Sequence, residues 1–304
     1  MAPDFETFIS TAWDEHGDHL QAVADRLAQS IHVVANATHA RRFAALVGHV
    51  FGEHLGQWQA GIVVLEALRA RAAAPTNPGD VDALAGPIAA LRFAQGDPAA
   101  VAALPAEHRI AALATAATAL VVQGDRARGL AAYARAVRLA EDHQPAMPST
   151  SPAIRALAVA GNNVAVELER KAGRSAAETA GMIDAARCAL RYWQRAGTWL
   201  EEERAEYRLA RSLLQAGARD AAVASAARCV QICTRNDAPP FELFFACAAL
   251  ALTHHAAGDP GASTMARATA LAAYARIDPG EQQYCADDLR ELNGAAASHS
   301  NGAE

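Results

Sequence analysis

The sequence has few aromatic residues, few cysteines and almost no lysine. Aromatic side chains make up 6% of its 304 residues, and there are five cysteines. An odd number of cysteines in so long a chain does not indicate a disulfide framework, so we expect reduced, buried thiols. The sequence contains neither a secretory signal pattern nor an apolar run long enough to span a membrane. We therefore expect a cytoplasmic protein without a membrane partner.

The charge balance argues against a dedicated nucleic-acid-binding protein. The formal net charge is −6, and Lys171 is the only lysine among 27 basic residues. A surface that binds duplex nucleic acid needs clustered basic side chains to displace counterions, and none stands out here. Hydrophobic residues reach 52%, and many of them are alanine. Alanine has the highest helix propensity and lets helices approach closely, so the composition favours many close contacts between helices.

A glycine recurs along the chain at intervals of about 40 residues. Each follows an apolar stretch of helical period and precedes another, as expected for the glycine that ends a helix. An aspartate often follows the glycine, where its side chain can cap the next helix. The glycines of this series are Gly17, Gly56, Gly96, Gly124, Gly173, Gly217 and Gly258.

This pattern predicts an all-α protein of about seven helical hairpins, because no segment alternates as a strand does. Clusters of proline and polar residues predict loops at 74–80, 144–152 and 236–240. Asp278, Pro279 and Glu281 are typical of the start of a last, capping helix. We expect N-terminal hairpins over 1–73, helical repeats over 80–292 and a disordered tail over 293–304.

The repeats resemble those of the tetratricopeptide repeat (TPR) family over residues 40 to 276. In that family a small residue and a large one precede the turn glycine, and an alanine follows on the second helix. The residues that carry the resemblance are Ala117, Leu120, Gly124, Tyr133 and Ala136, then Ala210, Leu213, Gly217, Ala222 and Cys229, and more loosely Ala251, Gly258 and Ala270. The resemblance implies a TPR-like α-solenoid. The spacing exceeds the family's 34 residues, so a different α-solenoid or an irregular helical bundle is the alternative.

Searches for catalytic and cofactor motifs give none of the common ones. The sequence has no glycine-rich nucleotide motif, no G-x-S-x-G and no H-E-x-x-H. Three local groups contain possible metal ligands: residues 14–19, then His49 with Glu53 and His54, and finally the pair Cys229 and Cys233. Capping, solvated turns and core packing explain each group separately, so we assign no metal and no cofactor.

Three classes of function fit these observations. A stacked helical array favours a non-catalytic scaffold or adaptor that binds a protein or peptide. The second class is a regulatory sensor module that binds a small molecule or signalling peptide, and the third is an enzyme on a helical fold. An open charged groove would favour the scaffold, a closed apolar cavity the sensor, and a buried acid pair in a deep pocket the enzyme. The sequence does not specify the oligomeric state.

The TPR resemblance also implies one candidate peptide-binding groove. Some TPR proteins hold a partner's C-terminal carboxylate with an asparagine from one repeat and two basic residues, four apart, from the next. Asn163 matches the asparagine, and Arg204 and Arg208 match the basic pair. Arginine can hold a carboxylate through two hydrogen bonds. The prediction is a groove for an acidic or C-terminal segment, formed by Asn163, Arg204, Tyr207, Arg208 and Arg211.

The clamp is incomplete in this sequence. The preceding repeat has Ala114 and Thr118 where the family has lysine and asparagine, and the turn at Gly173 is one residue late. The alternative for Arg204 and Arg208 is pairing with acidic residues of their own helix, within 201–203.

Overall fold

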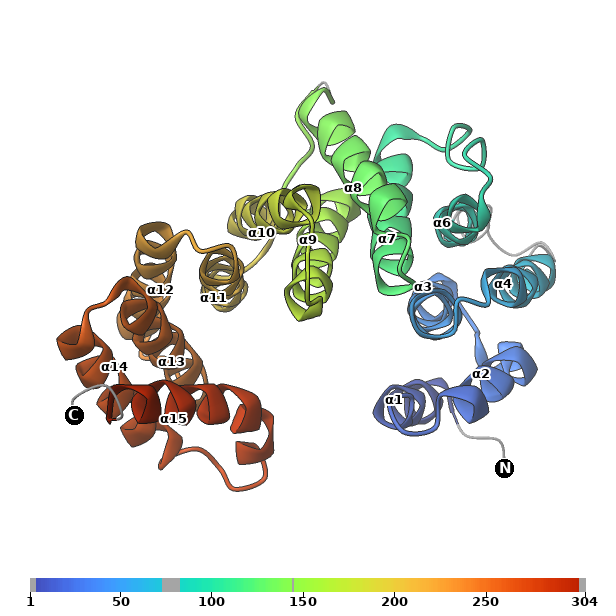
Figure 1. Ribbon diagram of the computed structural model, residues 1–304. Coiled ribbons are helices and arrows are strands. Elements are labelled where there is room, and N and C mark those ends of the chain that lie inside the picture. Colours follow the sequence, from blue (N-terminus) through green and yellow to red (C-terminus); the bar gives the residue numbers. More distant parts are fainter. Residues whose placement is uncertain (1–3, 73–82, 144, 301–304) are drawn as a thin grey trace. The chain divides into compact units, whose positions relative to one another are not determined.

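This computed structural model describes residues 4–72, 83–143 and 145–300, which are helical apart from their turns and loops (Figure 1). These residues form 14 α-helices and no strand, and most helices adjacent in sequence pack against each other. The prediction of an all-α protein built from successive helical hairpins is therefore confirmed. The chain divides into two compact units, Met1–Val164 and Ala165–Glu304.

The first unit begins with short helices and continues with longer ones. Its elements are α1 (Phe5–Glu15), α2 (Leu20–Gln29), η1 (Ile31–Val33), α3 (Ala37–Val47), η2 (Gly48–His54), α4 (Trp58–Ala72), α6 (Ala85–Gln95), α7 (Ala106–Val122), α8 (Arg126–Glu141) and the greater part of α9 (Pro152–Arg170). Large apolar residues such as Phe43, Leu46 and Leu65 are fully buried in one core shared by α1 to α6.

The helices α7 and α8 approach each other too closely for a side chain at Gly129. A Cβ atom there would lie 2.5 Å from Val121 Cγ2 and 2.9 Å from the carbonyl oxygen of Ala117. The close approach of the two helices therefore requires glycine at this position. Four residues further along α8, the Tyr133 hydroxyl donates a hydrogen bond of 2.9 Å to the carbonyl of Leu157 on α9.

The second unit continues with long helices. They are α10 (Ala176–Ala196), α11 (Trp199–Gln215), α12 (Arg219–Arg235), α13 (Pro240–Ala257), α14 (Pro260–Tyr274), η3 (Gln282–Cys285) and α15 (Ala286–Ser300). Each of α10 to α13 packs on the next, and α15 packs on α13. The core between α13, α14 and α15 contains Phe244, Cys247 and Leu292. Ser175 and Thr198 form capping boxes with Glu178 and Glu201 at the starts of α10 and α11.

The glycine series marks the turns as predicted. Gly124 and Gly217 have φ of 90° and 74°, in the left-handed region that side chains disfavour. The glycines at 56, 96, 173 and 258 also have positive φ, whereas Gly17 lies in a turn without it.

Two of the three predicted loops are present in the structure, whereas the last helix begins later than predicted. The loops at 145–151 and 236–239 are present, and the predicted loop at 74–80 lies outside the described residues. The last helix starts later than its sequence signal, because Asp278 instead accepts a hydrogen bond from the backbone of Gly280 and a turn follows. Residues 293–300 of the tail that we expected to be disordered belong to α15, and residues 301–304 lie outside the described residues. None of the described helices is long and apolar enough to cross a membrane.

Candidate functional site

Four of the five predicted groove residues lie on α11 in the second unit. Arg204, Tyr207, Arg208 and Arg211 are spaced by three and four residues, which places them along one side of the helix. Asn163 lies on α9 within the first unit.

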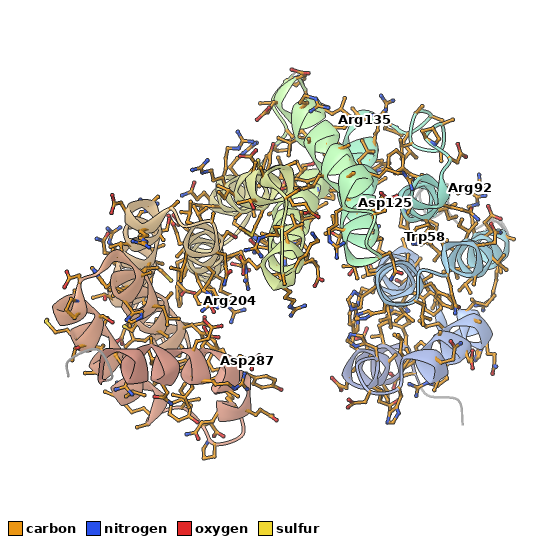
Figure 2. The ribbon with its side chains drawn as sticks, in the orientation of Figure 1. Trp58, Arg92, Asp125, Arg135, Arg204 and Asp287 are labelled. Atoms are coloured by element: carbon orange, nitrogen blue, oxygen red, sulfur yellow. The ribbon has the colours of Figure 1, made fainter. Side chains whose placement is uncertain are left out.

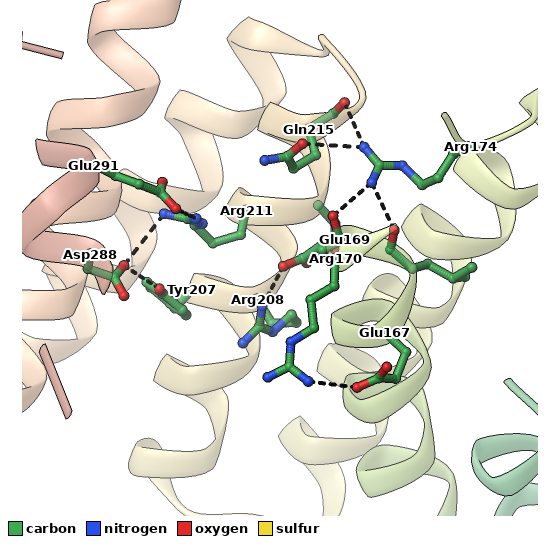
Figure 3. A network of polar contacts seen from close by, with 12 residues as sticks. Glu167, Glu169, Arg170, Arg174, Tyr207, Arg208, Arg211, Gln215, Asp288 and Glu291 are labelled. Carbon is green, nitrogen blue, oxygen red and sulfur yellow. Dashed lines mark hydrogen bonds and ion pairs between the residues drawn. The ribbon is translucent and has the colours of Figure 1, made fainter. Parts of the chain in front are cut away.

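Arg208 is held by a carboxylate from the end of α9. Its Nη1 lies 2.5 Å from Glu169 Oε2, and the Ser212 hydroxyl donates to Glu169 Oε1 at 2.6 Å (Figure 3). The side chains of Arg208 and Glu169 are 23% and 10% exposed. Both oxygens of Glu169 are thus occupied by α11, which ties the two helices together.

Tyr207 and Arg211 reach the acidic start of α15. The Tyr207 hydroxyl donates to Asp288 Oδ1 at 2.5 Å, and Arg211 Nη2 lies 2.8 Å from Glu291 Oε1. Arg211 Nη1 also lies 3.5 Å from Asp288 Oδ1. Figure 3 shows these side chains pointing toward each other across the two helices. Burial, with the nearby charge of Asp288, raises the pKa of Tyr207, so the tyrosine acts as a neutral donor.

Arg204 forms a two-point contact with Glu242 of α13. Its Nη2 lies 2.5 Å from Oε1 and its Nε 3.3 Å from Oε2. The Arg204 side chain is 55% exposed, so it is the most accessible of the three arginines. Figure 2 labels its position. Behind it, burial raises the pKa of Glu203 to about 7, and the charge of Glu242 adds to this shift. The Cys229 thiol donates to Glu203 Oε1 at 2.9 Å.

These contacts identify the partners of the basic residues. Sequence reasoning offered acidic residues of the same helix, but Arg204 and Arg208 pair with Glu242 and Glu169 from other helices. Those acids are 38 and 39 residues away in sequence, so no local pattern indicates them. An acidic ligand on this face would have to compete with carboxylates already in place. The groove assignment stays a prediction.

A cavity of about 550 Å³ lies in the first unit. Its lining is dominated by small and apolar residues from α3, η2, α6 and α7. The lining residues are Arg41, Ala44, Ala45, Gly48, His49, Glu53, Ala83, Gly86, Pro87, Ala90, Leu91, His108, Ala111, Ala112, Thr115 and Pro152. Ligand sites in proteins are commonly concave, mostly apolar and of this size, with a few polar groups that orient the ligand.

The small residues that line the cavity are what keep it open. Ala44, Ala90 and Ala112 are almost completely buried, and they form part of its apolar wall. Ala45 and Thr115 also line the cavity, yet both are exposed. The hollow is therefore a depression that solvent reaches rather than a packing defect. The sequence analysis did not predict the cavity. The alanines that line it follow one another along the helices, and ordinary helix packing gives the same pattern.

The polar groups of the cavity are Arg41, His49, Glu53 and His108. Arg41 donates to Thr38 Oγ1 at 3.3 Å and has no carboxylate partner among the residues that the structure describes. Glu53 Oε2 lies 2.8 Å from His49 Nδ1, so its charge is already engaged. Within the part of the chain that the structure describes, the cavity therefore combines an apolar wall with an exposed guanidinium that has no carboxylate partner.

The structure joins two of the groups of possible metal ligands. His16 from the end of α1 meets His49 and His54 of η2, and one donor nitrogen from each ring lies within 4.8 Å of the others. The third group behaves differently. Cys229 and Cys233 are buried, and burial raises the pKa of both thiols, which disfavours the thiolate that a metal requires.

Comparison with protein-family models and with curated proteins finds no match to this chain.

Proposed function

We propose that this protein is a non-catalytic binding module, a scaffold or adaptor built from TPR-like hairpins, and that it captures a peptide segment in the cavity of the first unit. The observation that carries the proposal is the cavity itself, because its apolar wall adjoins Arg41, whose guanidinium has no carboxylate partner among the described residues. The TPR resemblance of the repeats supports the same class of function.

The ligand chemistry follows from the lining. A volume of about 550 Å³ has room for a few side chains, and the alanine wall offers them apolar contact. Arg41 adds a cation that can form two hydrogen bonds with a carboxylate. A peptide ending in an apolar residue presents these two features together, a side chain and a free terminal carboxylate.

A small molecule with an apolar body and an acidic group is the second candidate, because the cavity is large enough to hold it whole. In that case the protein acts as a sensor module rather than as a scaffold. Both candidate ligands present an apolar group and a carboxylate to the same site. They differ in size, because a peptide extends beyond the cavity and a small molecule does not.

The test uses an immobilised library of peptides whose last two residues vary, each with a free C-terminal carboxylate and as the matching amide. We expect selective retention of the full-length protein by peptides with an apolar last residue and a free carboxylate. The Thr115→Trp variant should lose this binding because the indole fills the cavity from an exposed position. Arg41→Glu should lose it because the guanidinium is replaced by a like charge.

The matched controls lie on the second unit. Thr269 and Arg276 are exposed, and neither lines the cavity, so Thr269→Trp and Arg276→Glu should bind as the natural sequence does. Binding that is equally strong to amidated peptides, or that survives Thr115→Trp, would contradict the proposal. Binding of a free acidic small molecule, lost in Thr115→Trp, without binding of any peptide would favour the sensor.

A further inference from the structure

Three imidazole rings of the first unit converge on one point. His49 Nε2 lies 3.1 Å from His16 Nε2 and 3.0 Å from His54 Nε2. The planes of the His49 and His54 rings are 88° apart, and those of His16 and His49 are 64° apart. The rings therefore do not stack, and one ligand nitrogen from each of the three lies within 4.8 Å of the others.

The other nitrogens of two of these rings already have partners that can only accept a hydrogen bond. His49 Nδ1 lies 2.8 Å from the Glu53 carboxylate, and His16 Nδ1 lies 2.5 Å from the carbonyl oxygen of Trp13. Both Nδ1 atoms must carry the hydrogen, so the Nε2 of each neutral ring has a bare lone pair. Two lone pairs 3.1 Å apart repel each other unless a positive group lies between them.

The backbone of η2 is what brings His49 and His54 to the same side. η2 is a π-helix, and the Leu55 amide donates to the carbonyl of Val50, five residues earlier. On an α-helix, residues five apart point about 140° from each other, whereas the wider π turn brings them closer to the same side. Such turns are rare and are frequent at functional sites.

The end of η2 is fixed from α7. The Gln123 amide donates to the carbonyls of Glu53 and His54 at 2.5 and 3.2 Å, which provides partners for groups that a helix end leaves free. Gly56 has φ of 62°, and an added Cβ atom would lie 2.5 Å from Gln123 Oε1. The position of the two histidines is therefore determined by tertiary contacts.

The surroundings favour a cation. His16 is the C-cap residue of α1, and His54 is the last residue of η2, so two helix C-termini with their partial negative charge meet at the cluster. The Glu53 carboxylate behind His49 adds a full negative charge. A carboxylate or carbonyl that accepts from the distal nitrogen is the usual support of a metal-bound histidine.

We propose that His16, His49 and His54 bind a divalent transition-metal ion through their three Nε2 atoms, with Zn²⁺ as the reference ion. Imidazole ligands suit zinc, copper and nickel. With metal–nitrogen bonds of about 2.0–2.1 Å in tetrahedral geometry, ligand nitrogens lie roughly 3.3 Å apart. The spacings of 3.0 and 3.1 Å are close to this, and one ion can bind all three nitrogens, whereas a proton joins only two.

Three protein ligands leave the fourth position of a tetrahedral ion for water or an anion. His49 and Glu53 also line the cavity, so the ion would adjoin the site proposed for a peptide. The metal site does not depend on that proposal, because its ligands and its test are separate from the peptide.

The test is calorimetric titration of Zn²⁺ into full-length protein that has been treated with a chelator. We expect one ion per chain, bound in the micromolar range or tighter. His49→Ala should abolish binding. His54→Ala, which changes an exposed ring at the end of η2, should weaken it at least tenfold with an unchanged far-ultraviolet circular dichroism spectrum. The control His19→Ala removes an exposed histidine three residues from His16, outside the cluster, and should change nothing.

A second readout uses Trp13, whose ring centroid lies 5.4 Å from that of His16 and 5.1 Å from that of His49. Cu²⁺ should quench part of the tryptophan fluorescence with the stoichiometry of zinc binding, and Trp13→Phe should remove that component. Absence of stoichiometric binding would overturn the proposal. So would zinc that His49→Ala and His54→Ala retain unchanged, because the ion would then be bound elsewhere, for example at the thiols of the second unit.

Discussion

Glu169 and Arg208 meet at 2.5 Å between the end of α9 and the middle of α11, and Ser212 holds the second oxygen of the same carboxylate. The pair is largely buried, at 10% and 23% exposure. Removing one partner of such a pair leaves a charge that has lost water without gaining an opposite charge. Loss of either side chain should therefore destabilise the second unit.

We expect Arg208→Ala to lower the free energy of unfolding by about 2 kcal/mol, below the range for fully buried pairs because part of the arginine is exposed. The control is Arg170→Ala. Arg170 is 72% exposed and pairs with Glu167 three residues away, so its loss should cost less than about 0.5 kcal/mol. Urea denaturation of both variants measures the difference. Equal destabilisation would contradict the assigned partner of Arg208.

The predicted groove on α11 can be tested by removing a competitor. Arg204 is engaged by Glu242, so Glu242→Gln should release its guanidinium for an acidic ligand. If the face of Arg204, Tyr207, Arg208 and Arg211 binds acidic peptides, Glu242→Gln should tighten binding of a polyglutamate probe several-fold, and added salt should weaken it. The matched substitution Glu202→Gln leaves this pair in place. An affinity that does not change in Glu242→Gln would remove the groove from consideration.

The buried carboxyl of Glu203 should make stability depend on pH. Its pKa is raised from 4.5 to about 7 in the folded protein, first by burial and then by the charge of Glu242. Between these values the folded state holds a proton that the unfolded state releases. The free energy of unfolding should therefore fall as pH rises from 4.5 to 7, by about 3 kcal/mol in total.

Glu203→Gln should remove that dependence, because the amide does not ionise and its oxygen can still accept from the Cys229 thiol. The variant should be more stable than the natural sequence at pH 8 and similar to it near pH 4.5. Urea midpoints across this range measure both curves. Parallel curves would show that Glu203 is not the titrating group.

The turn glycines allow a matched pair of substitutions. Gly217 has φ of 74°, so Gly217→Val should cost about 1–2 kcal/mol through backbone strain. Gly17 lies in a turn without positive φ, and an added Cβ atom would meet nothing within 4 Å, so Gly17→Ala should be close to neutral. Thermal unfolding of the two variants separates them. A neutral Gly217→Val would contradict the hairpin register.

The sequence predicts local structure well and long-range partners poorly. Glycines such as Gly124 and Gly217 mark the turns because positive φ is a local requirement that few other residues meet. By contrast, His16 and His49 are 33 residues apart, and their contact depends on a π turn for which no propensity pattern is known. The same holds for Arg208 and Glu169, 39 residues apart, whose pairing follows from how two helices pack.

Binding of the apolar end of a peptide in the cavity of the first unit can be observed by methyl nuclear magnetic resonance of labelled threonines. Thr115 lines the cavity, whereas Thr179, Thr234 and Thr269 belong to the second unit and serve as internal references. On titration with the best peptide of the library, we expect a saturating shift of the Thr115 methyl signal, whereas the methyl signals of the reference threonines should not shift. A peptide that binds with shifts at the references and none at Thr115 would contradict it.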